Sequence, residues 1–533
     1  MPPLTWKYGL GFLAALLLMA VLFHYPVIVD HPPYGHHQWR QSDCWAITQN
    51  FYHEDRSLLE PRMNYMGHGE EDGFAEFPII YYTDARLMEL FGKSIAIPRA
   101  TNILILLTGL FFLFLTIRRV LKSEFWGGFL PLLCFSSPLL IYYGGSPMLN
   151  VPALSFLFFA FYTAHRYYRT GLDRFLLGTA IFIALAGVMR ATMVLGASAL
   201  YILFLGELFS KKGLAPGDKR LFPDPIKQGG ILLIPVLLVG GWVAYAKAWN
   251  SAEGHAYFLM GPSSFFTMNW KDTWMVATRL YQEFLHETYT RPFLFLLLLL
   301  FTVFLVRWNS FSRTARVILV TYAGMSILYG LGWYRNLYQH DYYLIDTFPM
   351  ALALIVVFIH FVKELAPAFL HSRMVRIPAL LLLLMGIYNG SVLQGKRFNI
   401  GGSLVNQTFI VSNAEEEYWD WFHNAQKPVR SLYGITPYLR SLGIERTDPV
   451  ISLPDPSPNH TLALMDQHGF TQLYRKGKEG KELLRMWMKQ GAEYLVVNDP
   501  SYLKNHDLSS CIDRQIGSYQ GVRIYRLVDR EKS

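Results

Sequence analysis

The chain is poor in charged residues, and this shortage restricts the class of protein it can be. Asp, Glu, Lys and Arg make up 16% of its 533 residues, whereas soluble globular proteins carry about 25%. Hydrophobic residues make up 52% and aromatic residues 16%, which suits lipid-facing helices with interfacial belts of Tyr and Trp. The composition excludes an ordinary soluble domain and predicts a polytopic membrane protein.

Cysteines and nucleotide-binding motifs are also scarce. Cys44, Cys134 and Cys511 are too few for a disulfide framework or a thiolate metal site. One disulfide, Cys44–Cys511, stays open on the condition that both residues lie outside the membrane. The sequence contains no P-loop and no GxGxxG, so it supports neither ATP-driven work nor a Rossmann fold for nucleotide sugars.

Long apolar runs, by contrast, are abundant. A membrane-spanning helix needs about 20 mostly apolar residues. The run 8–29 has no small-residue cleavage site after it, so we expect it to be retained as the first span. About eleven segments meet the length requirement: 8–29, 95–117, 126–143, 148–166, 174–189, 192–209, 229–249, 291–306, 316–334, 343–362 and 376–393.

Lys and Arg are concentrated in every second loop between these spans. The basic loops contain 118-RRVLK, 166-RYYRTGLDR, 211-KKGLAPGDKR, 307-RWNSFSRTAR and 373-RMVR. Because basic loops stay in the cytoplasm, this pattern predicts a cytoplasmic N-terminus and an extracytoplasmic C-terminus. It also accounts for the net charge of +9 without a nucleic-acid partner.

Composition divides the chain into two domains, 1–394 and 395–533. In the first, the outer loop 30–94 is expected to hold two amphipathic interfacial helices, at 44–54 and 78–92, and the loop 254–290 another. In the second, strand-like runs at 449–455, 493–499 and 521–528 alternate with helix-like runs at 429–442, 460–469 and 478–490. This alternation predicts a small, mostly parallel α/β domain on the outside.

Two acidic residues in the first outer loop are candidates for catalysis. Ionisable residues beside spans are functional candidates because desolvating a charge is costly. Asp43 lies in 36-HHQWRQSDCW, where His37, Arg40 and Gln41 could support it, although a helix cap is the simpler reading. Glu76 follows the acidic run 70–72, which we interpret as solvated, and its aromatic neighbours predict that it is held against the membrane face.

Basic residues are expected at two further outer positions. Arg190 falls between the spans 174–189 and 192–209, where it either snorkels or binds an anion such as phosphate. The stretch 333-WYRNLYQHDYYLIDTFPM adds Arg335, His340 and Tyr343 at another outer end. A cationic pocket facing two carboxylates suits phosphate-linked group transfer, because one side holds the leaving phosphate and the other deprotonates the nucleophile.

A metal site is a second interpretation of the same loop. His36, His37, Asp43 and Glu76 could together bind a divalent ion, but none of their spacings is diagnostic of a metal site. We therefore expect no certain cofactor and keep the divalent ion as an alternative.

Residues 8–394 resemble the GT-C superfamily of membrane glycosyltransferases, especially the family 39-like relatives that include bacterial protein O-mannosyltransferases and lipid A aminoarabinose transferases. The resemblance lies in 39-WRQSD, 76-EFPIIYY, Arg190 at the outer turn after the fifth span, and 340-HDYYLIDTFP. Two departures are Cys44, where many relatives have a second acidic residue, and Asn150, where many have an acidic residue in the next outer loop.

This resemblance implies an all-α GT-C membrane domain of about eleven spans with a soluble α/β domain after it. It implies an inverting transfer of a sugar from a polyprenyl phosphate to a hydroxyl of a glycan, lipid or protein, outside a bacterial inner membrane. Asp43 would be the general base and Glu76 a supporting carboxylate. The donor phosphate would lie among Arg190, Arg335, His340 and Tyr343.

Two other classes of function stay open on the sequence. A transporter or lipid flippase would place ionisable residues near the middle of the bilayer and often shows inverted repeats, whereas here the charges lie at the outer ends and no repeat is visible. Alternatively, the outer domain is a binding module with a membrane anchor, and its turn 452-SLPDPSPNHT contacts a ligand rather than only stiffening the loop. We expect the domain to shape the access of the acceptor.

Overall fold

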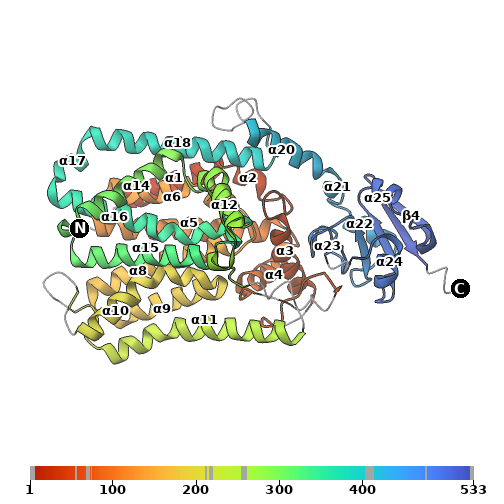
Figure 1. Ribbon diagram of the computed structural model, residues 1–533, viewed down its shortest axis with the longest axis horizontal. Helices are drawn as coiled ribbons and strands as arrows, with labels where there is room; N and C mark the ends of the chain where they lie inside the picture. Colours follow the sequence, from red (N-terminus) through yellow and green to blue (C-terminus); the bar gives the residue numbers. More distant parts are fainter. Residues whose placement is uncertain are drawn as a thin grey trace.

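The computed structural model describes residues 6–54, 57–67, 73, 75–210, 213–214, 220–253, 261–401, 413–473 and 477–528. The acidic run 70–72 lies outside the described residues. The structure has a helical bundle at one end, a small α/β domain at the other, and short helices of the first outer loop between them (Figure 1).

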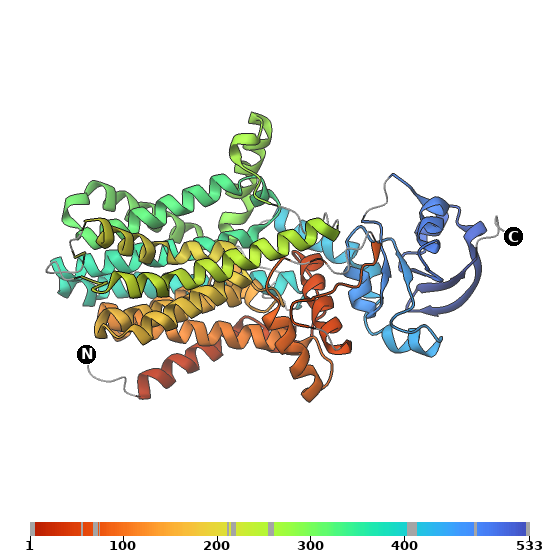
Figure 2. The ribbon, with the colours of Figure 1, turned by 90° about the horizontal axis from the view of Figure 1, so that it is seen from below.

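The bundle consists of long and short helices, and the long ones run roughly along the long axis of the molecule (Figures 1 and 2). They are α1 (Trp6–Leu22), α2 (Tyr25–Ile28), α5 (Ala96–Leu121), α6 (Glu124–Phe135), α7 (Pro138–Gly144), α8 (Asn150–Thr170), α9 (Asp173–Met189), η2 (Ala191–Ala197), α10 (Ser198–Ser210), α11 (Pro225–Glu253), α14 (Arg291–Val306), α15 (Arg313–Gly332), η9 (Asp341–Thr347), α16 (Phe348–Leu365), α17 (Pro367–His371) and α18 (Arg373–Arg397).

Every segment expected to span the membrane is helical, but not every one meets the criteria for a span. Among the described residues, six helices are long and apolar enough to cross a membrane, or seven if the bent pair α6–α7 is one span. The helices α1 and α14 are apolar but shorter. The chain is therefore an integral membrane protein, and the number of eleven spans stays a prediction.

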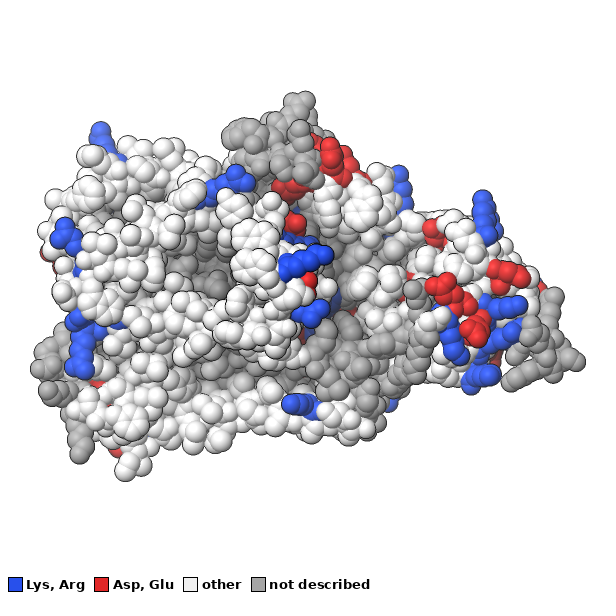
Figure 3. All heavy atoms as spheres, viewed as in Figure 1, with Lys and Arg blue, Asp and Glu red and all other residues white. Residues whose placement is uncertain are grey.

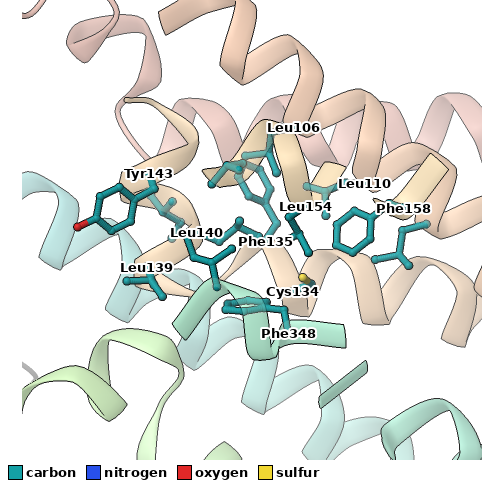
Figure 4. Packing of buried hydrophobic residues seen from close by; sticks show 14 of the residues in the cluster. Leu106, Leu110, Cys134, Phe135, Leu139, Leu140, Tyr143, Leu154, Phe158 and Phe348 are labelled. Carbon is teal, nitrogen blue, oxygen red and sulfur yellow. The ribbon is translucent and has the colours of Figure 1, made fainter. Parts of the chain in front are cut away.

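The third predicted span is broken, and the break shapes the core of the bundle. α6 and α7 meet at Ser136–Ser137 with a bend of 72°, because Pro138 cannot continue the α6 hydrogen-bond pattern. Helix α18 packs against this break through Gly386 and Gly390, where a Cβ would meet Ser136 and Ile141. Buried Leu, Phe and Tyr side chains of α5, α6, α7, α8 and α16 fill the space around it (Figure 4).

Charge is distributed along the bundle as a membrane requires. On the face shown in Figure 3, the sides of the bundle are almost free of charged residues, and Lys and Arg gather at the end remote from the outer domain. The N-terminus lies at that same end (Figure 2). Large apolar side chains such as Leu237, Leu298 and Leu328 are exposed on the helix surfaces, as expected of residues that face lipid.

The two helices of the first outer loop differ from each other in their surroundings. α3 (Gln38–His53) is buried at twelve of its sixteen residues, so the predicted interfacial position of 44–54 is wrong. The outer domain covers the face that the sequence pattern left to water or lipid. α4 (Ile79–Phe91) is amphipathic as predicted, with Leu90 and Phe91 exposed. α12 (Trp270–Arg279) is the helix expected in the loop 254–290, and Trp270 and Trp274 are exposed on it.

The outer domain is built on a mixed five-stranded sheet in the order β2-β1-β3-β5-β4. β1 pairs in parallel with β2 and β3, whereas β5 is antiparallel to β3 and β4, so the prediction of a mostly parallel sheet holds for only one half. The strands are β1 (Val450–Leu453), β2 (Gly469–Phe470), β3 (Tyr494–Val497), β4 (Ile512–Tyr519) and β5 (Val522–Leu527). The helices are α20 (Asn413–Ala425), α21 (Lys427–Arg430), α22 (Thr436–Ser441), α23 (His460–Met465), α24 (Gly480–Met488) and α25 (Ser501–Asn505).

Two further expectations change with the structure. α18 continues to Arg397, so the predicted domain boundary after residue 394 falls inside its last turn. Cys44, Cys134 and Cys511 are buried and free, which excludes the Cys44–Cys511 disulfide in this structure.

Candidate active site

A cavity of about 210 Å³ lies at the outer end of the bundle. It is lined by Ala75, Glu76, Asn150, Gly187, Val188, Met189, Arg190, Ala191, Thr192, Trp242, Val243, Trp333 and Tyr343. The first outer loop, α8, α9, η2, α11 and η9 all contribute to this lining. The cavity therefore brings together residues that are far apart in the sequence, among them three of the predicted site residues, Glu76, Arg190 and Tyr343.

Glu76 is held at the cavity wall by backbone contacts on either side of it. The Phe77 N–H donates to the Val188 carbonyl oxygen at 3.0 Å, and the Trp242 indole N–H donates to the Ala75 carbonyl oxygen at 3.1 Å. The Phe77 ring also packs edge-on against Trp242. The non-helical segment 75–77 is thereby fixed between α9 and α11, with 26% of the Glu76 side chain exposed.

Arg40 joins the two predicted catalytic carboxylates. Its guanidinium forms an ion pair with Glu76, and its Nη1 lies 3.5 Å from Oδ2 of Asp43. Burial opposes the charge of Arg40, but Glu76 and the other neighbours outweigh it and raise its pKa. Arg40 is therefore charged, and Asp43 and Glu76 lie on either side of one cation.

Asp43 is placed differently from the sequence prediction. α3 begins at Gln38 with His37 as its N-cap residue, so Asp43 lies in the second turn and is not a helix cap. Its side chain is wholly buried. Glu76, expected only to support Asp43, is the carboxylate that lines the cavity.

Arg190 lies between α9 and η2, at the turn where the sequence predicted it. Its extended backbone ends α9, and its Nε donates to Oδ1 of Asp346 at 2.6 Å. Nη2 donates to the Tyr329 hydroxyl at 3.2 Å, and the guanidinium lies 4.7 Å from the centre of the Tyr343 ring. Burial opposes its charge, but Asp346 outweighs this and raises its pKa. Among the described residues, no hydrogen bond occupies Nη1, which leaves its two N–H groups for a ligand.

The other three predicted phosphate ligands differ in whether they reach the cavity. Tyr343 lines the cavity, and His340 packs against it with ring centroids 5.2 Å apart. Burial, reinforced by His37, lowers the pKa of His340 to about 3, so His340 is neutral and adds no positive charge. Arg335 is exposed, and no described contact joins its side chain to the cavity. The predicted cationic pocket thus reduces to Arg190 and Arg40.

His37 belongs to a second buried cluster that the sequence did not single out. Its Nε2 lies 3.1 Å from Oδ1 of Asp341, which also accepts a hydrogen bond of 2.5 Å from the Tyr143 hydroxyl. Burial and the neighbouring Asp341 raise the pKa of Glu287 despite Arg397, which pairs with Glu287 at 2.8 Å. Both acids are recognisable in the sequence as outer acidic residues, but the 53 positions between them hide their proximity.

Gln41 supports the backbone and not the cavity. Its amide nitrogen donates to the carbonyl oxygens of Tyr34 and His36 and to the Tyr142 hydroxyl, while its oxygen accepts from Arg99. Every polar atom of this buried side chain is used in the turn that leads into α3. Gln41 therefore fixes the position of α3 at its start.

Two tryptophans in the lining and one acid beside it were not expected from the sequence as parts of a site. Trp242 and Trp333 supply aromatic walls, and Asp346 orients Arg190. Tryptophan in an apolar span resembles an ordinary interfacial residue, so no signal separated these two from the others. Asn150, noted only as a departure from the related family, also lines the cavity.

The arrangement offers acid–base groups and a cation, but no metal site. Among the described residues, no group of three or more His, Cys, Asp or Glu side chains is arranged to hold a metal ion. The four residues considered for a divalent ion instead pair with Arg40 and Asp341 or pack against aromatic rings. Among the described residues, these four side chains are therefore not arranged as a set of metal ligands.

Comparison with known proteins gives a similarity in fold. No family model and no curated protein sequence matches the chain. The chain is similar to ArnT from Cupriavidus metallidurans bound to undecaprenyl phosphate, with a TM-score of 0.59, 11% identity and 98% of each chain covered. The apo form of that protein gives a TM-score of 0.58 at 11% identity, with 97% of this chain and 98% of that chain covered.

A second solved protein is similar over a smaller part of its length. The Archaeoglobus fulgidus oligosaccharyltransferase, in complex with Zn and sulfate, gives a TM-score of 0.50 at 14% identity, with 90% of this chain and 67% of that chain covered. Together these similarities confirm the GT-C fold that the sequence motifs predicted.

Proposed function

We propose that the protein is a glycosyltransferase that moves a sugar from a polyprenyl phosphate to a hydroxyl group of a glycan, lipid or protein. The observation that carries this proposal is the cavity at the outer end of a GT-C fold, because Glu76 and Arg190 line it together. A structure of the similar protein ArnT contains undecaprenyl phosphate, which supports a lipid phosphate as the leaving group.

The proposed reaction is a single displacement at the sugar carbon that is bonded to phosphate. The acceptor hydroxyl loses its proton to a carboxylate, and its oxygen forms a bond to that carbon. The bond from carbon to the phosphate oxygen breaks, and the electron pair leaves with the polyprenyl phosphate. The configuration at carbon inverts, and the proton is passed from the carboxylate to water.

Asp43, Arg40 and Glu76 supply the acid–base step in this proposal. Glu76 reaches the cavity, and Arg40 lies between the two carboxylates and pairs with both. Asp43 holds Arg40 from the buried side. Catalytic contacts often tighten only when substrate is bound, so we assign the role of proton acceptor to Asp43 and Glu76 together, on either side of Arg40. Both carboxylates are required in this proposal.

Arg190 is the proposed partner of the leaving phosphate. Asp346 and Tyr329 fix two edges of its guanidinium, so its free donor is preorganised for an oxyanion. Thr192 and Tyr343 add hydroxyl groups to the same wall. Trp242 and Trp333 offer apolar faces against which a sugar ring can pack. His340 contributes a neutral ring and not a charge.

The proposed location is the extracytoplasmic face of a bacterial inner membrane. Polyprenyl-phosphate donors suit that face because they need no nucleotide, and the sequence carries no nucleotide-binding motif. The cavity lies at the outer end of the bundle, and α1 begins at the other end (Figure 2). The basic loops support a cytoplasmic position for the end where α1 begins.

Isosteric substitution of the two carboxylates tests the proposal. Isolated membranes of the source cell contain the natural donor and acceptor, and release of polyprenyl phosphate can be followed by mass spectrometry. We expect Asp43→Asn and Glu76→Gln each to slow release at least about 100-fold, the lower range of a general-base contribution. Glu89→Gln is the matched control, because Glu89 is exposed and pairs only with Arg86.

The outcomes separate the roles of the two residues. Full activity in both carboxylate variants would reject the proposed acid–base group. Loss in Asp43→Asn alone would assign the proton to Asp43, and loss in Glu76→Gln alone would assign it to Glu76.

A further inference from the structure

The outer domain is joined directly to the helix that carries Arg40 and Asp43. Helix α23 packs against α3, and its first residue, His460, is 2% exposed. The imidazole Nδ1 of His460 lies 2.7 Å from Oγ of Ser42, the residue before Asp43. The Asn459 amide also donates to the Ser42 carbonyl oxygen at 3.4 Å. One residue of α3 is therefore held through both its side chain and its backbone.

The turn that presents Asn459 and His460 is stiff. The Asp455 carboxylate accepts hydrogen bonds from the Ser457 N–H at 2.8 Å, the Thr461 N–H at 2.9 Å and the Thr461 hydroxyl at 2.6 Å. Asp455 is 3% exposed, so it closes the turn and does not face a ligand. The turn 452-SLPDPSPNHT, which the sequence left between a ligand contact and a stiffened loop, is a stiffened loop that contacts α3.

The hydrogen-bond pattern defines how His460 acts. Ser42 has one hydroxyl proton, and its Oγ donates to the Gln38 carbonyl oxygen at 2.9 Å. Nδ1 of His460 must then carry a proton and donate to Oγ of Ser42 if both contacts are hydrogen bonds. Burial lowers the pKa of His460 to about 3, so the ring is neutral and protonated on Nδ1 only.

A second group of contacts holds the other end of α3. Asp466 follows α23 and pairs with Lys93, with His53 at 3.1 Å and with Arg446 at 3.1 Å. Arg446 also bonds to Asn50 and to Glu54, the latter at 3.2 Å. His53 and Asn50 lie in the last turn of α3, and Glu54 ends it. The outer domain therefore grips α3 at its middle and at its C-terminal end.

We infer that the outer domain is a positioning element for the chemical step, and that His460 is the residue through which it holds α3 in register with Glu76. Arg40 and Asp43 lie on α3, whereas Glu76 is fixed separately to α9 and α11. The geometry between them depends on how α3 is placed, and displacements of about 1 Å at a reacting centre can cost about 100-fold in rate. The inference rests on the proposed function only in taking the chemical step to be the proposed sugar transfer.

This inference differs from the sequence-based expectation that the domain shapes acceptor access. A domain that only selects the acceptor would change the acceptor KM and leave the rate at saturation unchanged. A positioning domain changes the rate and leaves donor binding unchanged. No described contact joins the turn at His460 to Arg190 or Tyr343, so binding of a lipid phosphate should not depend on His460.

Three variants of the full-length protein in lipid nanodiscs test the inference. His460→Ala removes the contact with Ser42. His460→Asn is the conservative variant, because its amide nitrogen can occupy the place of Nδ1 and donate. His506→Ala is the matched control, since His506 lies in the same domain and its described contacts, a hydrogen bond to the Tyr502 carbonyl oxygen and stacking on the Tyr502 ring, do not reach α3.

Three measurements are needed. Hydrogen exchange of the backbone amides of 38–53 reports the placement of α3. Binding of undecaprenyl phosphate reports the Arg190 side of the cavity. Release of polyprenyl phosphate in membranes with the natural donor and acceptor reports the reaction. We expect His460→Ala to raise exchange in α3 and slow release by about 10- to 100-fold, with unchanged binding of undecaprenyl phosphate. His460→Asn should recover most of the rate, and His506→Ala should behave as the wild type.

Each other result has a definite meaning. Unchanged exchange in α3 for His460→Ala overturns the inference, and this measurement does not depend on any catalytic activity. Raised exchange with an unchanged release rate overturns the positioning role. An equal loss of undecaprenyl phosphate binding and of rate shows general unfolding and also overturns it. A wild-type protein that releases no polyprenyl phosphate rejects the proposed function, while the exchange result still decides the coupling to α3.

Discussion

Arg40 and Arg190 are largely buried cations that lie among carboxylates at the two sides of the candidate site, with 16% and 13% of their side chains exposed. Burying a charge is costly unless it is paired and hydrogen-bonded, and both arginines meet this condition through Glu76, Asp43 and Asp346. An incoming phosphate therefore enters a site whose cations already have partners. Binding then depends on free donors and on how firmly the arginines are held.

Arg190 gives a direct prediction about the binding of a lipid phosphate. Arg190→Ala should weaken binding of undecaprenyl phosphate by about 10- to 100-fold, because a hydrogen bond to a charged group contributes about 1.5–3 kcal/mol. The affinity of Arg190→Lys for undecaprenyl phosphate should lie between those of the wild type and Arg190→Ala, since an ammonium keeps the charge but loses the planar donor geometry. Titration of the purified protein measures this. Arg335→Ala is the control, and an equal effect there would contradict the assignment.

Glu287 gives a prediction about pH. Burial raises its pKa above the ordinary value of 4.5 despite the opposing effect of Arg397. The folded protein keeps a proton on Glu287 at pH values where the unfolded chain has lost it. The stability contributed by this group is therefore present below about pH 4.5 and declines as the pH rises toward the raised pKa.

Glu287→Gln should remove this dependence, because the amide resembles the protonated carboxyl and does not ionise. Thermal unfolding in detergent at pH 5 and pH 9 measures it. The fall in Tm between the two values should be smaller in the variant by at least about 2 °C, the shift produced by about 1 kcal/mol in a large domain. Equal falls in both proteins would show that Glu287 ionises normally.

Among the helices, α3 shows most clearly where sequence patterns mislead. Its apolar residues recur at helical spacing with polar residues between them, which predicted an amphipathic helix at the membrane surface, yet twelve of sixteen are buried. Polar side chains can be buried when they find partners, and here some of the partners belong to the outer domain more than 350 positions away, as in the contact of Ser42 with His460. A local pattern contains no information about such a distant partner.

The close packing of α5 on α8 leaves no room for a side chain at Gly109, and this can be tested by substitution. A Cβ on Gly109 would lie 2.9 Å from the Cα of Ser155, so a side chain there must push the helices apart. Gly109→Ala should destabilise the protein by about 1–3 kcal/mol, seen as a lower Tm and a lower yield of monodisperse protein.

Gly240 in α11 is the matched control for this substitution. A Cβ there would meet no atom within 4 Å, and Ala favours a helix over Gly by up to about 1 kcal/mol. Gly240→Ala should therefore leave the Tm unchanged or raise it. A similar loss in both variants would show that the close approach of α5 and α8 is not responsible.

At the scale of the whole molecule, charge and shape agree on the arrangement across the membrane. Lys and Arg stand at the end of the bundle where α1 begins, the sides of the bundle are almost free of charge, and the outer domain lies at the opposite end (Figures 2 and 3). Basic loops favour the cytoplasm. We therefore expect the outer domain to be extracytoplasmic, with the proposed sugar transfer on the same side.

Single cysteines test this orientation. All three native cysteines are buried, so they should react slowly with a membrane-impermeant maleimide. In intact spheroplasts, Lys489→Cys in the outer domain should be labelled at once, whereas Thr170→Cys at the end of α8 should be labelled only after permeabilisation. Both positions are exposed. Labelling in the reverse order would invert the topology and reject an extracytoplasmic reaction.

The sequence alone determined the membrane class, the positions of the helices, the outer domain and the residue types of the site. These follow from local quantities, because apolar runs, basic loops and short motifs act over about 20 residues. Only the tertiary structure decided that Glu76 and not Asp43 lines the cavity, that His340 is neutral, that Arg335 lies apart, and that Glu287 meets Asp341. Burial and the distance between side chains depend on how distant helices pack, and no segment of the chain specifies that by itself.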